Sequence, residues 1–291
     1  MSVTVRTVTL PGGLTLPYAE RGRRDGIPVV LVHGYVDSWR AFEPLLHRLP
    51  LSLHAFAPTQ RGHGDAGKPP GGYLPRDFAA DLSAFLDRLE LEHAVLVGGS
   101  SGGVQARMAA ARLPHRVTGL VLLGVPAALA DKPGAEELWA TVAELRDPIA
   151  PDFVERFASG LTAAPLDPAF LRTVVRENLK APARVWRDTL RGLLDTDLRA
   201  TLPHVRVPTL VVWGDRDTVL SRADQESIVD AVPDARLVVY EGAGHVVYWD
   251  SPERAARDVA EFAERVTASH AAREAGARSR PGGGPGRPAG P

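Results

Sequence analysis

Short apolar runs rich in valine and leucine alternate along the chain with longer segments in which apolar residues recur at helical spacing. This alternation predicts a mostly parallel β-sheet with helices on both faces. Residues 3–10 and 14–20, joined by Pro11-Gly12-Gly13, predict an initial hairpin. Six further runs predict the following strands at residues 29–33, 53–57, 94–98, 117–124, 209–214 and 236–240. We therefore expect an α/β fold built on an eight-stranded sheet.

The alternation is interrupted once, over residues 126–202, which carry helical patterns and repeated prolines but no convincing strand. We call this segment the helical insertion and expect it to form a cap on the core. The core domain is then expected to comprise residues 1–125 and 203–269. Residues 270–291 are mainly Gly, Pro, Arg and Ala and offer little to bury, which predicts a disordered tail.

Composition excludes several functional classes. The 291 residues include 34 Lys and Arg against 35 Asp and Glu, so we expect no nucleic-acid partner. The absence of cysteine excludes disulfides, thiolate metal sites and thiol catalysis. The longest apolar runs are far too short to span a bilayer, and residues 1–10 lack the pattern of a signal peptide. A cytoplasmic protein without a membrane span is expected; its oligomeric state is not predicted.

The most informative segment is residues 94–103, where a buried strand runs into small residues and then into a helix. This layout is typical of a nucleophile elbow, a strained turn that presents a serine between closely approaching backbones. Two overlapping registers fit the pattern Gly-x-Ser-x-Gly, one centred on Ser100 and the other on Ser101. Because the pattern alone also occurs in flexible glycine-rich turns, this segment leaves both registers and that simpler alternative open.

A serine hydroxyl becomes a nucleophile when a base accepts its proton, and the base needs a carboxylate to orient it. Two acids, Asp215 and Asp217, follow the strand at residues 209–214, and His245 follows the strand at 236–240. The carboxyl ends of strands are where ligands bind in open α/β sheets. Asp217 is the preferred acid, because Asp215 directly after the strand could equally form an Asx-type turn.

At this point the chain resembles the α/β-hydrolase superfamily, in the branch with a helical cap, over roughly residues 3–268. The matching segments are residues 31–35 (Leu-Val-His-Gly-Tyr), 60–64 (Gln-Arg-Gly-His-Gly), 97–103, 208–217 and 242–245. The resemblance implies that Ser100 is the nucleophile, Asp217 the triad acid and His245 the base. It also implies that the backbone N–H groups of Tyr35 and Ser101 form the oxyanion hole.

One departure from the family pattern is Gly99, which stands before the serine where relatives usually carry His or another side chain. It removes no catalytic group. His33 and His63 lie near the expected site, but no cluster of His, Asp and Glu has the spacing of zinc ligands. We therefore expect these histidines to fix loops, and we expect neither a metal nor a cofactor.

A serine at the elbow favours acyl transfer over the alkyl-ester chemistry of relatives that attack with a carboxylate. We expect a cofactor-independent serine hydrolase that cleaves an ester, lactone or related acyl bond of a small to medium substrate. A carbon–carbon bond hydrolase or a cofactor-free perhydrolase shares the same triad and stays open. A ligand receptor or interaction protein that keeps the fold without turnover is the alternative from another class.

Four aromatic residues are candidates for the wall of a substrate pocket: Trp139, Phe157 and Trp186 in the helical insertion, and Trp249 shortly after His245. Helical spacing makes plain core packing the commoner role for the residues of the insertion. The identity of the substrate does not follow from them.

Overall fold

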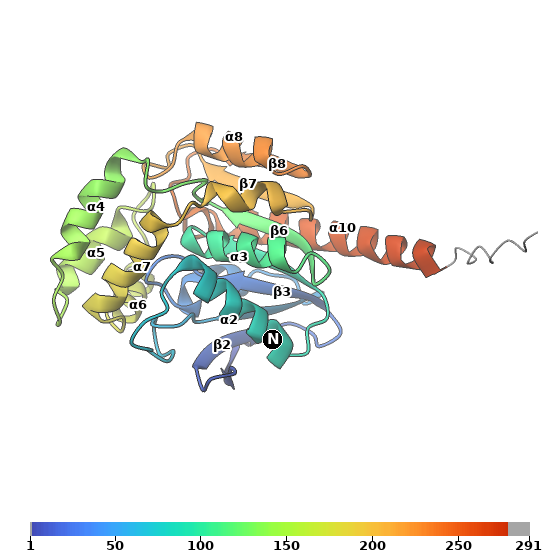
Figure 1. Ribbon diagram of the computed structural model, residues 1–291, viewed down its shortest axis with the longest axis horizontal. Helices are drawn as coiled ribbons and strands as arrows, with labels where there is room; N and C mark the ends of the chain where they lie inside the picture. Colours follow the sequence, from blue (N-terminus) through green and yellow to red (C-terminus); the bar gives the residue numbers. More distant parts are fainter. Residues whose placement is uncertain (1, 279–291) are drawn as a thin grey trace, which may run out of the picture.

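The computed structural model describes residues 2–278. Its centre is one eight-stranded sheet with the strand order β1-β2-β4-β3-β5-β6-β7-β8 (Figure 1). The strands are β1 (Thr4–Thr9), β2 (Thr15–Arg21), β3 (Ile27–Val32), β4 (Leu53–Pro58), β5 (Ala94–Gly99), β6 (Val117–Leu123), β7 (Thr209–Gly214) and β8 (Ala235–Tyr240). All eight predicted strands are present.

Most of the strand pairs are parallel. The hairpin of β1 and β2 is antiparallel, with Thr4 opposite Glu20 and Thr9 opposite Thr15, and β2 also pairs antiparallel with β4. The five remaining pairs, from β4-β3 to β7-β8, are parallel. This arrangement brings the carboxyl ends of β3, β5, β6, β7 and β8 to one edge of the sheet, and it confirms the predicted fold class.

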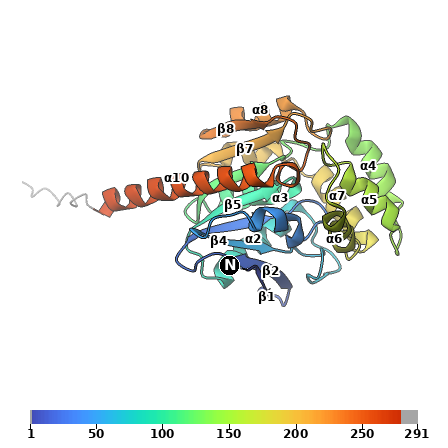
Figure 2. The same cartoon turned by 180° about the vertical axis from the view of Figure 1, so that it is seen from behind.

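Helices cover both faces of the sheet (Figures 1 and 2). Outside the helical insertion they are η1 (Trp39–Phe42), α1 (Glu43–Leu46), α2 (Pro75–Arg88), α3 (Ser101–Arg112), α8 (Arg222–Ala231), α9 (Val247–Asp250) and α10 (Pro252–Arg278). Successive residues of β3 face opposite sides: Val29 and Leu31 pack in a cluster with α10, whereas Val30 packs in a cluster with α2 and α3. Burial on both sides explains why this strand is a continuous apolar run.

The helical insertion connects β6 to β7 and lies at one end of the sheet (Figure 1). It contains α4 (Pro133–Ala143), α5 (Pro151–Ser159), α6 (Pro168–Asn178), α7 (Ala183–Asp195) and the start of η2 (Arg199–His204). Three of these helices begin at a proline. Proline is well suited to the first position of a helix, because the N–H group there has no partner within the helix. Residues 126–202 are all described, and none of them lies in a strand.

The predicted disorder from residue 270 onward is wrong for residues 270–278, which continue α10 beyond the body of the molecule (Figures 1 and 2). The segment Ala271-Ala-Arg-Glu-Ala is rich in strong helix formers. It extends a helix that is already nucleated, so it needs no buried surface of its own. Residues 279–291 lie outside the described residues. Among residues 2–278, no helix combines the length and apolar character needed to cross a membrane.

Candidate active site

Ser100 lies in the turn between β5 and α3 with a strained backbone conformation, φ +48° and ψ −125°, that non-glycine residues rarely adopt. Two glycines make this turn possible. A Cβ atom on Gly98 would lie 2.3 Å from the backbone of α3, and one on Gly102 would lie 2.2 Å from a carbonyl oxygen of β3. The turn therefore has the layout of a nucleophile elbow centred on Ser100. Ser101 is the first residue of α3.

Hydrogen bonds connect Ser100 to His245 and His245 to Asp217. Ser100 Oγ lies 2.9 Å from His245 Nε2, and His245 Nδ1 lies 2.9 Å from Asp217 Oδ2. The side chain of Asp217 is fully buried and that of His245 is 4% exposed. Because a carboxylate only accepts hydrogen bonds, the imidazole donates from Nδ1, which leaves Nε2 free to accept the serine proton.

The structure also separates the two candidate acids. The second oxygen of Asp217 accepts hydrogen bonds from the N–H groups of Val219 at 2.7 Å and Leu220 at 2.9 Å, which fixes the loop after β7. Asp215 is exposed and accepts a hydrogen bond from the N–H of Gly242 at 2.6 Å. Asp217, and not Asp215, therefore contacts His245.

The two backbone N–H groups expected to form an oxyanion hole belong to segments that meet at Ser100. That of Ser101 lies at the amino-terminal end of α3, where the helix dipole is positive. Tyr35 follows Gly34, and a Cβ atom on Gly34 would lie 3.3 Å from Ser100 Cβ. Within residues 2–278 neither N–H donates a hydrogen bond to a protein group. Both are thus available to a negative charge that develops beside Ser100.

His33 fixes the loop that carries Tyr35. Its Nδ1 donates to the carbonyl oxygen of Gly34 at 2.8 Å, and its Nε2 accepts from the N–H of Gln60 at 3.0 Å. Burial, together with the neighbouring His63, lowers the pKa of His33 to about 3, so the ring stays neutral and keeps this pattern. Burial also lowers the pKa of His63 to about 4, and its Nδ1 donates to the carbonyl oxygen of Arg61 at 2.6 Å. Both histidines bind backbone groups of their loops, as expected from the sequence.

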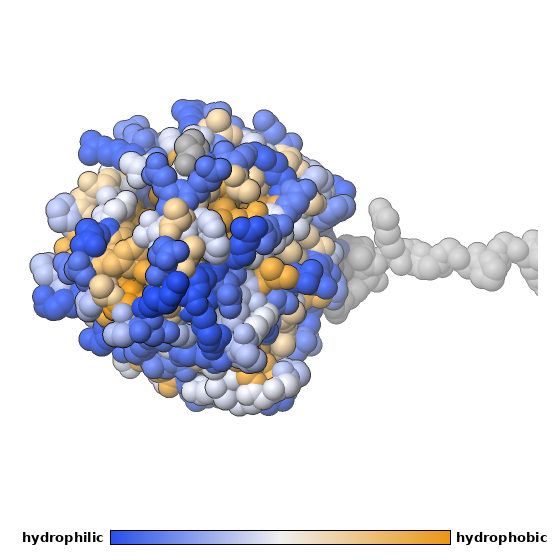
Figure 3. All heavy atoms as spheres, turned by 60° about the vertical axis from the view of Figure 1, so that its left-hand side comes forward, coloured by the Kyte–Doolittle hydropathy of each residue, from blue (hydrophilic) through white to orange (hydrophobic). Residues whose placement is uncertain are grey.

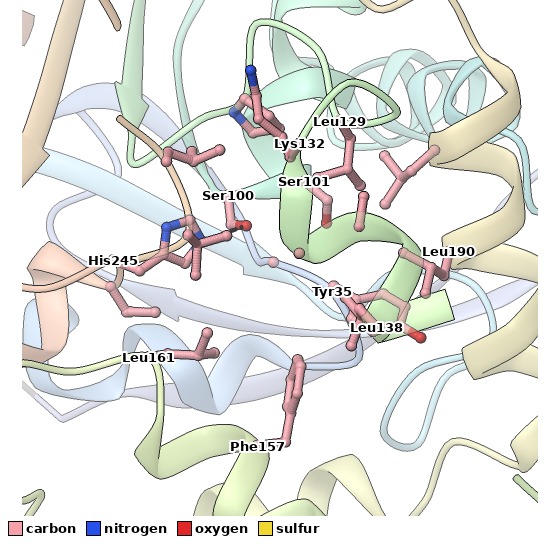
Figure 4. Close-up of a pocket in the computed structure, with 18 of the residues that line it drawn as sticks. Tyr35, Ser100, Ser101, Leu129, Lys132, Leu138, Phe157, Leu161, Leu190 and His245 are labelled. Atoms are coloured by element: carbon pink, nitrogen blue, oxygen red, sulfur yellow. Dashed lines mark hydrogen bonds between the residues drawn. The ribbon is translucent and has the colours of Figure 1, made fainter. Parts of the chain in front are cut away.

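A cavity of about 400 Å³ opens between the core and the helical insertion, with Ser100 and His245 in its wall (Figure 4). Most of the remaining wall is apolar and comes from the insertion and from the loop after β7: Leu129, Leu138, Phe157, Leu161, Leu190, Leu193, Val219 and Leu220. Val219 is 40% exposed, so the cavity reaches the surface there. Viewed from the side of the insertion, patches of hydrophobic residues lie among hydrophilic ones (Figure 3). This cavity suits a small, largely apolar molecule.

Of the four aromatic residues predicted to line the pocket, Phe157 does so and the other three do not. Trp186 is fully buried behind the wall, with its ring 5.5 Å from that of Phe157. Trp249 donates from its indole N–H to the carbonyl oxygen of Ala41 at 2.8 Å. Trp139 packs beside the guanidinium of Arg191. These three residues lie away from the cavity wall, because neither a place in the insertion nor closeness to His245 in the sequence determines whether a side chain faces a cavity.

Tyr248 explains the glycine at position 99. A Cβ atom on Gly99 would lie 2.6 Å from the Tyr248 hydroxyl oxygen, so the phenol ring fills the space that a side chain at position 99 needs. The ring is held by stacking on Phe42, with centroids 4.6 Å apart. Tyr248 also lines the cavity. The short distance in sequence between His245 and Tyr248 suggests that Tyr248 borders the pocket, but the sequence does not show that its ring fills the space beside Gly99.

Asp250 ties the loop of His245 to the helical insertion, another role that the sequence did not suggest. Its Oδ2 accepts from the N–H of Gly244 at 2.7 Å and from the N–H of Ala163 at 3.0 Å. A further hydrogen bond joins the N–H of Val246 to the carbonyl oxygen of Leu161 at 3.0 Å. The insertion therefore helps to position the imidazole.

Asp37 is a polar residue of the cavity that sequence reasoning missed. It lies in the loop after Tyr35 and is 6% exposed. Burial raises the pKa of its carboxyl group from 3.8 to about 7, although the amide of Asn178 opposes the shift. The neutral acid is therefore favoured in the folded protein well above the pH at which an exposed aspartate ionises.

This raised pKa predicts that Asp37→Asn stabilises the protein more at pH 8 than at pH 4.5. Because the folded state holds a proton that the unfolded chain has lost, wild-type stability falls as pH rises between about 4 and 7. The asparagine variant avoids this loss, so its advantage should grow by roughly 1.4 kcal/mol for each pH unit crossed in that window. Urea unfolding of both proteins at the two pH values measures it. An advantage that does not grow with pH, or that grows equally in the exposed control Asp215→Asn, contradicts the prediction.

Comparison with known proteins places these features among hydrolases. A family model described as alpha/beta hydrolase fold matches residues 27–252. The chain is 31% identical over 266 residues to 2-(acetamidomethylene)succinate hydrolase of Mesorhizobium japonicum, covering 86% of this chain and 92% of that protein. It is 32% identical over 242 residues to pimeloyl-[acyl-carrier protein] methyl ester esterase of Aromatoleum aromaticum, covering 77% and 93%. A thermophilic esterase from Thermogutta terrifontis aligns with a TM-score of 0.78 at 27% identity, covering 90% of this chain and 99% of that one.

Proposed function

The chain belongs to the α/β-hydrolase family, and from that premise we propose that it is a cofactor-independent serine hydrolase of ester, lactone or related acyl bonds. The main support for the proposal is the pair of hydrogen bonds that connects Asp217 to His245 and His245 to Ser100, each 2.9 Å long. The cavity of about 400 Å³ supports a small to medium acyl compound as the substrate.

In the first half of the reaction, Ser100 Oγ attacks the carbonyl carbon of the substrate while His245 Nε2 takes the hydroxyl proton. The carbonyl π-electrons move onto oxygen, and the backbone N–H groups of Tyr35 and Ser101 stabilise that negative charge. The intermediate then collapses, the bond to the leaving oxygen breaks, and the imidazolium gives its proton to the leaving group. An ester of Ser100 remains, and an alcohol departs.

In the second half, water takes the place of the alcohol. His245 accepts a proton from the water molecule while the water oxygen attacks the acyl carbon. The backbone N–H groups of Tyr35 and Ser101 stabilise the second oxyanion. Breakage of the bond to Ser100 Oγ releases the acid and returns the proton to serine. Asp217 stays ionised throughout, orienting the ring and stabilising its cationic form.

A panel of short-chain esters, lactones and thioesters tests this proposal. We expect the purified protein to hydrolyse at least one class, and a fluorophosphonate probe to label it stoichiometrically, because both reactions need only the activated serine. Absence of turnover across the panel together with absence of labelling contradicts the proposal. Saturable binding of panel members that raises Tm without forming product also contradicts it and favours a ligand receptor. Peracid formation from acetate and hydrogen peroxide, without ester hydrolysis, favours a perhydrolase.

A further inference from the structure

The cavity wall contains polar side chains that the proposed reaction does not use, among them Asp37 and Tyr248. Asp37 comes from the loop after β3, and Tyr248 comes from α9. Lys132 also lines the cavity, but its ammonium group is held by the carboxylates of Asp131 and Asp224. The hydroxyl group of Tyr35 donates to the carbonyl oxygen of Trp186 at 2.6 Å, and Thr218 is exposed. Apart from the triad, the buried polar side chains of the wall are then Ser101, Asp37 and Tyr248, and the last two come from outside the elbow.

Asp37 and Tyr248 each lie close to a glycine that neighbours Ser100. The position that a Cβ atom on Gly34 would occupy lies 3.3 Å from Ser100 Cβ and 3.5 Å from Asp37 Oδ2. The corresponding position on Gly99, the residue directly before Ser100, lies 2.6 Å from the Tyr248 hydroxyl oxygen. Both side chains therefore line the cavity in the neighbourhood of Ser100.

The hydroxyl group of Tyr248 is buried and has no hydrogen-bond partner among the described residues, and the whole residue is 1% exposed. Asp37 has the amide of Asn178 beside it and no cationic partner within the same part of the chain. Buried polar groups of this kind are normally satisfied, and leaving them without a partner costs free energy. For the Tyr248 hydroxyl group, the position in the wall of a cavity indicates that a ligand supplies the missing partner, and the Asp37 carboxyl group lines the same cavity.

We propose that Asp37 and Tyr248 form a polar subsite for an oxygen atom on the α-carbon of the acyl group, so that the preferred substrates are esters or lactones of 2-hydroxy acids. This inference rests on the proposed serine-hydrolase function. A hydroxyl group matches the pair because it donates a hydrogen bond to the carboxyl group of Asp37 and accepts one from the phenol of Tyr248.

The direction of approach assigns this subsite to the acyl part of the substrate. The leaving oxygen must lie against His245 Nε2 to receive its proton. Asp37 and Tyr248 lie elsewhere around Ser100, next to Gly34 and Gly99. In the acyl-enzyme, a 2-hydroxyl oxygen is four bonds from Ser100 Cβ, which suits these short separations. A second carboxylate at this place is disfavoured, because no cation among the described residues accompanies Asp37 and a buried carboxylate without one loses its hydration uncompensated.

The test compares ethyl 2-hydroxybutanoate, as each enantiomer, with ethyl butanoate. We expect one hydroxy ester to be preferred in kcat/KM by about ten-fold, the scale of one buried hydrogen bond. Tyr248→Phe and Asp37→Asn should each bring this ratio close to one, because each lowers kcat/KM for the hydroxy ester by more than it lowers kcat/KM for ethyl butanoate. The control Tyr240→Phe removes another buried phenol hydroxyl, which bonds Asp258 at 2.7 Å away from the cavity wall, and should keep the wild-type ratio.

If the pair has a purely structural role, each variant should lose the same fraction of kcat/KM with both esters, and that result overturns the subsite. A ratio of the two kcat/KM values near one in the wild-type protein also overturns it. Calorimetric titration of Ser100→Ala with 2-hydroxybutanoate and butanoate separates the subsite from catalysis. We expect the hydroxy acid to bind about ten-fold more tightly, and Tyr248→Phe in the same background to abolish the difference. Preferential binding by a protein that neither hydrolyses any member of the ester, lactone and thioester panel nor reacts with fluorophosphonate would leave the subsite standing and contradict the proposed function. Equal binding of the two acids overturns the subsite.

Discussion

Asp217→Asn is expected to lower kcat/KM by about 10⁴-fold while leaving the fold intact. The asparagine amide has nearly the same shape, and its oxygen still accepts hydrogen bonds from the N–H groups of Val219 and Leu220. Its NH₂ group, however, donates toward His245 Nδ1, so the imidazole proton moves to Nε2 and the ring no longer accepts from Ser100. Steady-state kinetics on the best ester of the panel measures the loss, and circular dichroism verifies the fold.

The matched control is Asp215→Asn, the same chemical change two residues earlier. The side chain of Asp215 is exposed and, among the described residues, accepts one hydrogen bond, from the N–H of Gly242, so kcat/KM should stay within about three-fold of the wild-type value. Large loss in the Asp215 variant with retained activity in the Asp217 variant would transfer the role of the acid to Asp215.

Ser100→Ala should abolish both turnover and fluorophosphonate labelling, because it removes the oxygen atom that attacks the carbonyl carbon. Loss of a serine nucleophile lowers kcat by about 10⁶-fold in comparable triads. Ser101→Ala, by contrast, keeps the backbone N–H at the start of α3 and should retain much of the activity. The two variants differ by the position of one hydroxyl group, so each controls for the effect of the other on folding.

Retained labelling of Ser100→Ala, with labelling lost in Ser101→Ala, would select the other register of the elbow. In that register the oxyanion donor after the serine becomes the N–H of Gly102, and Asp217 and His245 keep their roles. Labelling that survives in both variants would place the reactive group outside the elbow altogether.

The sheet was predictable because its signal is local. The valine- and leucine-rich runs of β3 and β5 are buried on both faces, so each appears as an uninterrupted apolar run bounded by polar or glycine-rich residues. The glycines around the elbow likewise mark a close approach of backbones. The register of the elbow was not predictable from its pattern, because both serines satisfy Gly-x-Ser-x-Gly, and the structure distinguishes them by the backbone angles of Ser100 and its contact with His245.

Features that depend on distant segments of the chain left no such signal. Asp37 and Tyr248 lie in a loop and a four-residue helix far apart in the sequence, and no periodicity links them. The positions of Trp186 and Trp249 depend on their contacts with Phe157 and Ala41, which are far from them in the sequence. The continuation of α10 to Arg278 was missed because composition was averaged over a segment whose first residues favour a helix.

The most direct test of the account is the site of the fluorophosphonate adduct. Trypsin is expected to release residues 89–107 as one peptide that holds both elbow serines, so fragment ions from tandem mass spectrometry can assign the modified position. The account predicts a single phosphonate on Ser100, whose hydroxyl oxygen lies 2.9 Å from His245 Nε2. An adduct on Ser101, or an unmodified peptide from protein that hydrolyses esters, would contradict it.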